Sequence, residues 1–159
     1  MKYSTLLLLA AAFSLSACAS GPSETTTSSA APLAVEAIPA SGLGPQTLAP
    51  GECGLFLWSQ TDASRFIFFQ RGASDTALMQ IGESAATLNR TRSGGTIFGQ
   101  FMTRQTFTAD LGETIDLAIT PGEELDGGQR IEGGRLTLTD NDSWQTVTPV
   151  LGVRACQPG

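Results

Sequence analysis

The sequence predicts an all-β domain, a small antiparallel β-barrel or sandwich of about eight strands. Short segments of alternating apolar and polar residues recur at intervals of roughly 8–12 residues with turn-forming residues between them, which is typical of such folds. No segment after the N-terminal apolar run repeats its apolar residues with the 3.6-residue period of a helix. The region 50–159 is long enough to bury a core of its own as one domain.

The expected strands begin and end at turn-forming residues. They cover 54–60, 65–71, 76–81, 86–91, 96–106, 114–120, 135–139 and 144–153. The run Ser93-Gly94-Gly95 is expected to turn the chain between the fourth and fifth strands. The run Pro121-Gly122-Glu123-Glu124 is expected to begin a loop with room for one helical turn.

Residues 18–49 are predicted to form a flexible linker in front of this domain. The segment is rich in Ser, Thr and Ala, and it also contains Pro32, Pro39 and Pro45. Such a composition buries too little apolar surface to offset the entropy lost on ordering. As a random coil, a linker of this size has an r.m.s. span of roughly 30 Å.

The first 17 residues have the parts of an export signal. Lys2 precedes an apolar run from Leu6 to Phe13, which is too short to span a membrane. The following Leu15-Ser16-Ala17-Cys18 resembles the lipobox of bacterial lipoproteins. The resemblance implies that residues 1–17 are cleaved and that Cys18 carries a diacylglycerol thioether and an acyl group, palmitate, on its amine. The alternative is an ordinary secretory signal cleaved near Ala17 or Ala19.

Lipidation at Cys18 would fix the location of the protein. Two or more acyl chains give stable membrane anchoring without a spanning helix. In the lipoprotein family an Asp after the lipidated Cys retains the protein in the inner membrane, and Ala19 and Ser20 lack that mark. If the organism has an outer membrane, the resemblance therefore implies a protein on its inner leaflet that faces the periplasm.

The other two cysteines, Cys53 and Cys156, are expected to form one disulfide. With Cys18 acylated, the remaining number is even, and exported proteins usually pair their cysteines. Cys53 precedes the first expected strand and Cys156 follows the last, so the bond would place those two strands side by side. A meander whose first and last strands touch is a closed or nearly closed barrel. Two buried thiols are the alternative.

The composition argues against several function classes. The formal net charge of −6 disfavours nucleic acid as a partner, because an acidic surface repels phosphates. The chain has no His, and its single Lys and single Tyr lie in the expected signal, so the usual base of nucleophilic triads is missing. The carboxylates of Glu123-Glu124-Asp126 and Asp140-Asp142 are the candidates that remain for glycoside hydrolysis, but both sets lie in turn-rich sequence where solvated acids are the rule. Asp140-Asn141-Asp142 starts like an EF-hand loop but lacks the Gly and Glu that such a loop needs later. We therefore predict no enzyme activity, no cofactor and no bound metal.

The first expected hairpin is the predicted docking surface for an envelope protein, because both of its faces are apolar. Leu55 and Leu57 would face one way and Phe56 and Trp58 the other, while Phe66 and Phe68 would oppose Ile67 and Phe69. The surface would comprise Phe56, Trp58, Arg65, Ile67, Phe69 and Arg71. The alternative is that the linker or a loop covers the second face.

A second resemblance suggests another function. Ser93-Gly94 is similar to the start of the Ser-Gly-x-x-Tyr motif on the inhibitory loop of membrane-bound lysozyme inhibitors, with Ile97 at the Tyr position and Phe98 beside it. The resemblance implies hydrolase inhibition through Ser93, Gly94 and Phe98. A lipocalin-like cup for an apolar ligand is a third option. The leading expectation remains a lipid-anchored, non-catalytic binding or scaffold module.

Overall fold

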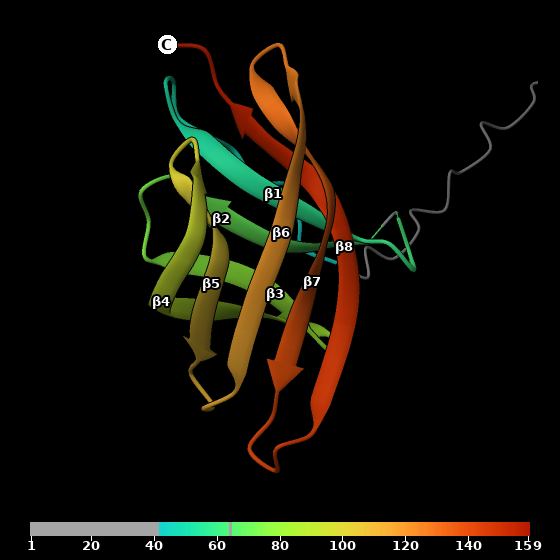
Figure 1. Cartoon of the computed structure of the whole chain (residues 1–159). Helices are drawn as coiled ribbons and strands as arrows, with labels where there is room; N and C mark the ends of the chain where they lie inside the picture. Colours follow the sequence, from blue (N-terminus) through green and yellow to red (C-terminus); the bar gives the residue numbers. More distant parts are fainter. Residues whose placement is uncertain (1–41, 64) are drawn as a thin grey trace, which may run out of the picture. The chain divides into compact units, whose positions relative to one another are not determined.

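A computed structural model describes residues 42–63 and 65–159, which form a closed antiparallel barrel of consecutive hairpins (Figure 1). The strands are β1 (Cys53–Ser59), β2 (Phe66–Arg71), β3 (Thr76–Ile81), β4 (Ser84–Phe98), β5 (Phe101–Ala109), β6 (Thr114–Leu125), β7 (Gly128–Thr139) and β8 (Gln145–Cys156). The expected signal peptide, Cys18 and most of the expected linker lie outside the described residues. Within the described part, no helix has the length and apolar content of a membrane span.

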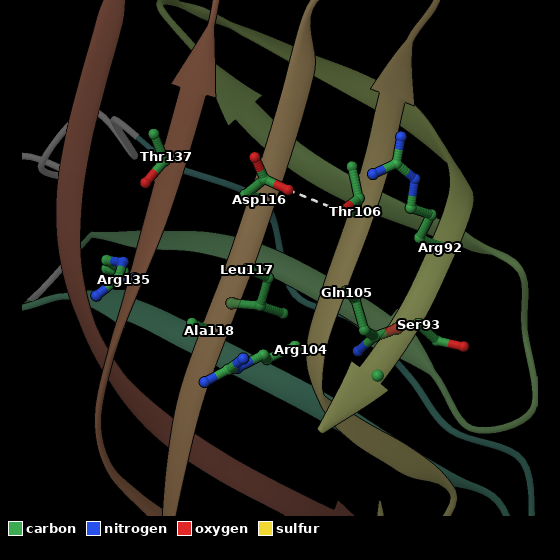
Figure 2. Close-up of a pocket in the computed structure, with 11 residues that line it drawn as sticks. Arg92, Ser93, Arg104, Gln105, Thr106, Asp116, Leu117, Ala118, Arg135 and Thr137 are labelled. Carbon is green, nitrogen blue, oxygen red and sulfur yellow. Dashed lines mark hydrogen bonds between the residues drawn. The ribbon is translucent and has the colours of Figure 1, made fainter. Parts of the chain in front are cut away.

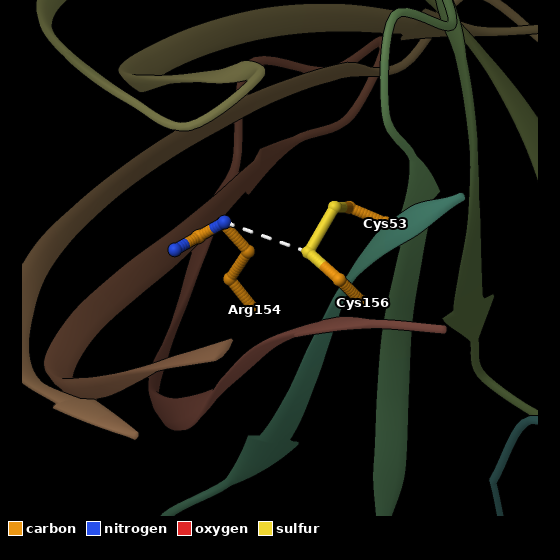
Figure 3. Close-up of a disulfide and its surroundings, with 3 residues drawn as sticks. All are labelled: Cys53, Arg154 and Cys156. Atoms are coloured by element: carbon orange, nitrogen blue, oxygen red, sulfur yellow. Dashed lines mark hydrogen bonds between the residues drawn. A yellow bond between two sulfur atoms is a disulfide. The ribbon is translucent and has the colours of Figure 1, made fainter. Parts of the chain in front are cut away.

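The barrel closes where β1 pairs with β8, which confirms the predicted fold class and selects the barrel over the sandwich. The pairing runs from Cys53 opposite Cys156 to Ser59 opposite Val150. The two cysteines form the predicted disulfide, with an S–S distance of 2.05 Å and a sequence separation of 103 (Figure 3). Closure pairs both outer strands of the meander, so neither is left as an open edge.

Large apolar side chains fill the barrel interior. Leu55 and Leu57 of β1 are fully buried, and equivalent inward positions recur on alternate residues of the other strands. The largest fully buried side chains are Phe68, Phe101, Phe107, Leu55, Leu57, Leu88, Ile115, Leu117, Ile131, Leu136, Gln70 and Val150. An interior of eight strands is just wide enough for side chains to fill.

One polar network lies among these apolar residues. The amides of Gln70 and Gln105 exchange two hydrogen bonds, of 3.0 and 2.9 Å. The Arg90 guanidinium donates to Gln105 Oε1 at 3.2 Å and also pairs with Asp75 at the surface. Each buried amide therefore has partners, as buried polar groups require.

The chain turns at two places other than those expected, and the first difference divides the expected strand 96–106 between β4 and β5. Strand β4 does not end at Ser93-Gly94-Gly95 but continues to Phe98 with shifts of register against β5, and the turn lies at Gly99-Gln100. Gly95 and Gly99 have positive φ angles of 81° and 59°. A glycine of this kind serves a bulge inside a strand as well as a turn, so the Gly-Gly pair did not distinguish them.

The second difference concerns the segment after Thr120. It was expected to be a loop, but β6 continues through Pro121 to Leu125, and β7 already begins at Gly128. The connection is the two-residue loop Asp126-Gly127, in which Gly127 has a φ of 76°. Pro121 lies at a shift of register between the strands, where a missing N–H donor is tolerated.

Candidate functional site

The expected docking hairpin carries an outward aromatic cluster on β1 and β2. The cluster consists of Phe56, Trp58, Phe66 and Phe69, with ring centroids 4.9 Å apart for Phe56 and Phe69 and 5.1 Å apart for Trp58 and Phe66. The expected facing of β2 is wrong at one point. The register shifts between Leu57 and Trp58, so Phe66 turns outward opposite Trp58, while Ile67 lies in the interior core with 5% exposure.

The end of the expected linker covers part of this cluster. The backbone N–H of Leu43 donates to the Phe66 carbonyl at 2.7 Å, and Leu43 and Phe69 are only 7% and 3% exposed. The Arg71 guanidinium donates to the Thr47 carbonyl at 2.9 Å. The end of the expected linker therefore lies against β2, where Phe69 is buried, while Phe56, Trp58 and Phe66 are half-buried.

The two arginines expected at the rim of the docking surface have structural partners. The Arg71 guanidinium lies 2.6 Å from Glu52 Oε2 and 5.5 Å from the centroid of the Phe69 ring. The backbone N–H of Ala49 and, secondarily, the Arg71 guanidinium hold the pKa of Glu52 below its ordinary value. Arg65 Nη2 donates to the Gly82 carbonyl at 3.2 Å. These contacts hold the covering segment and the adjacent turn in place.

The proposed inhibitory loop has no exposed aromatic tip. Phe98 is 6% exposed and packs inside the barrel against Phe101, with ring centroids 5.8 Å apart. Ser93 and Gly94 lie within β4 on the barrel wall. Ile97 is the large apolar side chain exposed here, at 73%. Insertion of Phe98 into the cleft of an enzyme would require it to leave the core.

A groove on the outer wall of β4–β7 brings together residues that the sequence analysis did not single out. The groove has a volume of about 520 Å³ (Figure 2). Arg104 of β5 pairs with Ala118 of β6, which pairs with Arg135 of β7, so two arginines flank a small side chain in one row. The neighbouring row contains Arg92, Thr106, Asp116 and Thr137.

We call this surface, with its three arginines and the residues between them, the arginine groove. The three arginines lack partners within the described part of the chain. Arg92, Arg104 and Arg135 are exposed, and none makes an ion pair or hydrogen bond with another described residue. The single carboxylate in the groove, Asp116, accepts a 2.7 Å hydrogen bond from the Thr106 hydroxyl. Three unpaired guanidinium groups beside one carboxylate favour anionic ligands.

Only the register could reveal this groove. Arg92, Arg104 and Arg135 are far apart in the sequence, and each is an ordinary polar residue on an alternating strand. Their meeting depends on the bulges that shift β4 against β5 and on the long β6–β7 hairpin, both of which the sequence analysis missed. The signal that the sequence did offer was that each arginine alternates with the inward-facing residues of its strand, which places it on the outer wall.

A second cavity, of about 340 Å³, opens at the end of the barrel near the β3–β4 turn. Its apolar lining includes Ile67, Met79 and Leu138, and its polar lining includes Thr146 and Thr148. The filled interior beyond these side chains limits its depth. Among residues 42–63 and 65–159, no group of three His, Cys, Asp or Glu side chains has positions suited to a metal ion.

The fold and surface define a class: a disulfide-closed, eight-stranded antiparallel barrel with a packed interior and an arginine-lined outer groove. Comparisons with protein-family models, curated protein sequences and solved structures find no match for this chain.

Proposed function

We propose that the chain is a lipid-anchored, non-catalytic binding module that faces the periplasm and holds an anionic envelope component in the arginine groove. The observation that carries the proposal is the set of three exposed guanidinium groups around one concave surface, none of which has a partner among residues 42–63 and 65–159. In a chain with a formal charge of −6, such a concentration of positive charge creates a local field opposite to that of the whole molecule.

The location rests on the N-terminal sequence. The lipobox-like Leu15-Ser16-Ala17-Cys18 supports acylation of Cys18, and the Ser, Thr and Pro content of the following segment supports a flexible connection. A connection of roughly 30 Å lets the barrel reach envelope material beside the membrane that holds its anchor. Mass spectrometry of the mature chain tests this step, and an unacylated N-terminus would refute it.

The binding step is tested with matched arginine variants. Arg135 and Arg130 lie on the same strand β7 and both are exposed, but only Arg135 lines the groove. The full chain is mixed in detergent with detergent-washed envelope solids, so that the anchor does not contribute to retention. We expect Arg135→Gln to reduce retention and Arg130→Gln to leave it unchanged. Equal retention of the two variants would contradict the role of the groove.

The barrel-end cavity supports a second candidate function, the binding of a small apolar ligand. Its volume of about 340 Å³ lies at the low end of the range for small-molecule sites, and barrel mouths often bind ligands. Displacement of a fluorescent fatty acid from the full chain tests this function. A Leu138→Trp variant, which adds bulk at the cavity wall, should abolish the signal if the ligand binds there.

A further inference from the structure

We infer that the arginine groove recognises a short acidic peptide that also carries a free ammonium group, such as the peptides that cross-link bacterial cell walls. The inference rests on the proposed function and specifies its ligand. It follows from three features of the groove: the separation of two arginines, the place of Asp116 and the small residues on the floor.

The spacing of the two flanking arginines fits a peptide. Arg104 and Arg135 lie on strands separated by one intervening strand, and neighbouring strands are about 4.8 Å apart, so their backbones are roughly 10 Å apart. An extended peptide advances about 3.4 Å per residue. An extended tripeptide therefore spans about this distance, so two of its carboxylates could each meet one guanidinium, and each pair could form the bidentate hydrogen bonds that arginine favours.

Asp116 distinguishes this ligand from a simple polyanion. It lies two residues from Ala118 on β6, which is roughly 7 Å along the strand, and it lines the same groove (Figure 2). The Thr106 hydroxyl donates one hydrogen bond to Asp116 Oδ1, and Asp116 remains exposed. A carboxylate at this position repels a phosphate but attracts an ammonium group.

The floor of the groove leaves space for a main chain. Ala118 has the smallest side chain that a non-glycine residue can have, and Gly94 lies in the same row. A Cβ atom added to Gly94 would meet no heavy atom within 4 Å, so this part of the floor is open. A peptide can lie flat across the row with its charged groups directed to the arginines and to Asp116.

Calorimetry with the full chain in detergent tests the inference. The probe is the synthetic tripeptide L-Ala–γ-D-Glu–meso-diaminopimelate, compared with the same peptide with amidated carboxylates and with inorganic phosphate. We expect Arg104→Gln and Arg135→Gln each to weaken tripeptide binding about tenfold, the loss of one charge-assisted contact. Arg130→Gln should leave binding unchanged, and Ala118→Leu should weaken it by filling the floor without changing charge.

Asp116→Asn gives the sharpest result. It should weaken tripeptide binding and strengthen phosphate binding, because it removes a partner for the ammonium group and a repulsive charge for the phosphate. Tighter tripeptide binding by this variant would overturn the ammonium contact, and phosphate binding tighter than tripeptide binding in the unaltered chain would overturn the inference. If the tripeptide does not bind while retention on envelope solids still depends on Arg135, the inference fails and the proposed function stands. If neither depends on Arg135, both fail.

Discussion

Reduction of the Cys53–Cys156 disulfide should lower the stability of the barrel by about 4–5 kcal/mol. The bond joins residues separated by 103 positions, and the chain-entropy relation gives about 4.7 kcal/mol for a loop of about this size. Reduction removes no atoms, so the β1–β8 ladder and the packing around Cys53 can persist in the folded state. The free energy changes because the unfolded chain regains the freedom that the cross-link had removed.

Equilibrium urea unfolding of the full chain, with and without reductant, measures this difference. For an m-value of about 2 kcal/mol/M, the midpoint should fall by roughly 2 M on reduction. The Cys53→Ala/Cys156→Ala double variant is the control, because reductant should not shift its midpoint. A loss of less than about 1 kcal/mol on reduction would refute the loop-closure reasoning.

Three further predictions concern single residues. In the folded chain the pKa of Glu52 lies below its ordinary value of 4.5, so the contribution of Glu52 to stability is complete above pH 4.5 and is lost as the pH falls through the folded pKa. The urea midpoint, measured as a function of acid pH, should show this loss, and the Glu52→Gln variant should lack it. Gln105→Ala should cost about 1–3 kcal/mol because it removes the donor to the buried Gln70 Oε1, while Gln70 Nε2 keeps the Ser74 carbonyl, and a cost below 0.5 kcal/mol by urea unfolding would contradict that role. Gly152→Ala should destabilise the chain by at least about 1–3 kcal/mol because the new Cβ would lie 2.0 Å from a backbone oxygen of β1, whereas Gly133→Ala, which meets nothing within 4 Å, should unfold near the urea midpoint of the unaltered chain.

Strict alternation and cysteine placement were sufficient to predict much of the fold. The segment 114–120 alternates cleanly and matches the first part of β6, and the expected strand 76–81 has the bounds of β3. Cys53 and Cys156 immediately bracket the alternating region, so their bond selected closure. These predictions were correct because the alternation of side chains is set within one strand, and because a bond between the two ends of the region fixes which strands meet.

The predictions that were wrong concern places where the same local sequence is compatible with two structures. Gly94-Gly95 fits a turn or a bulge, and only pairing with β5 decides between them. One shift of register near Trp58 turned Phe66 outward and kept Ile67 inside, because a single slip reverses the facing of a side chain. The arginine groove depends on the same long-range registers, so it could not be predicted from the spacing of its residues.

The pairing of β1 with β8 joins Cys53 to a cysteine 103 positions later, and this separation has a consequence for the export proposed above. In the export proposed above, Cys18 and Cys53 would emerge before Cys156, because they precede it in the chain. A free thiol at Cys18 would compete for Cys53 through a much shorter loop, whose closure costs less entropy than the native one. Acylation of Cys18, as proposed here, consumes that thiol first. Acylation would then prevent a non-native Cys18–Cys53 bond, and Cys53 would remain reduced until Cys156 became accessible to form the bond that closes the barrel.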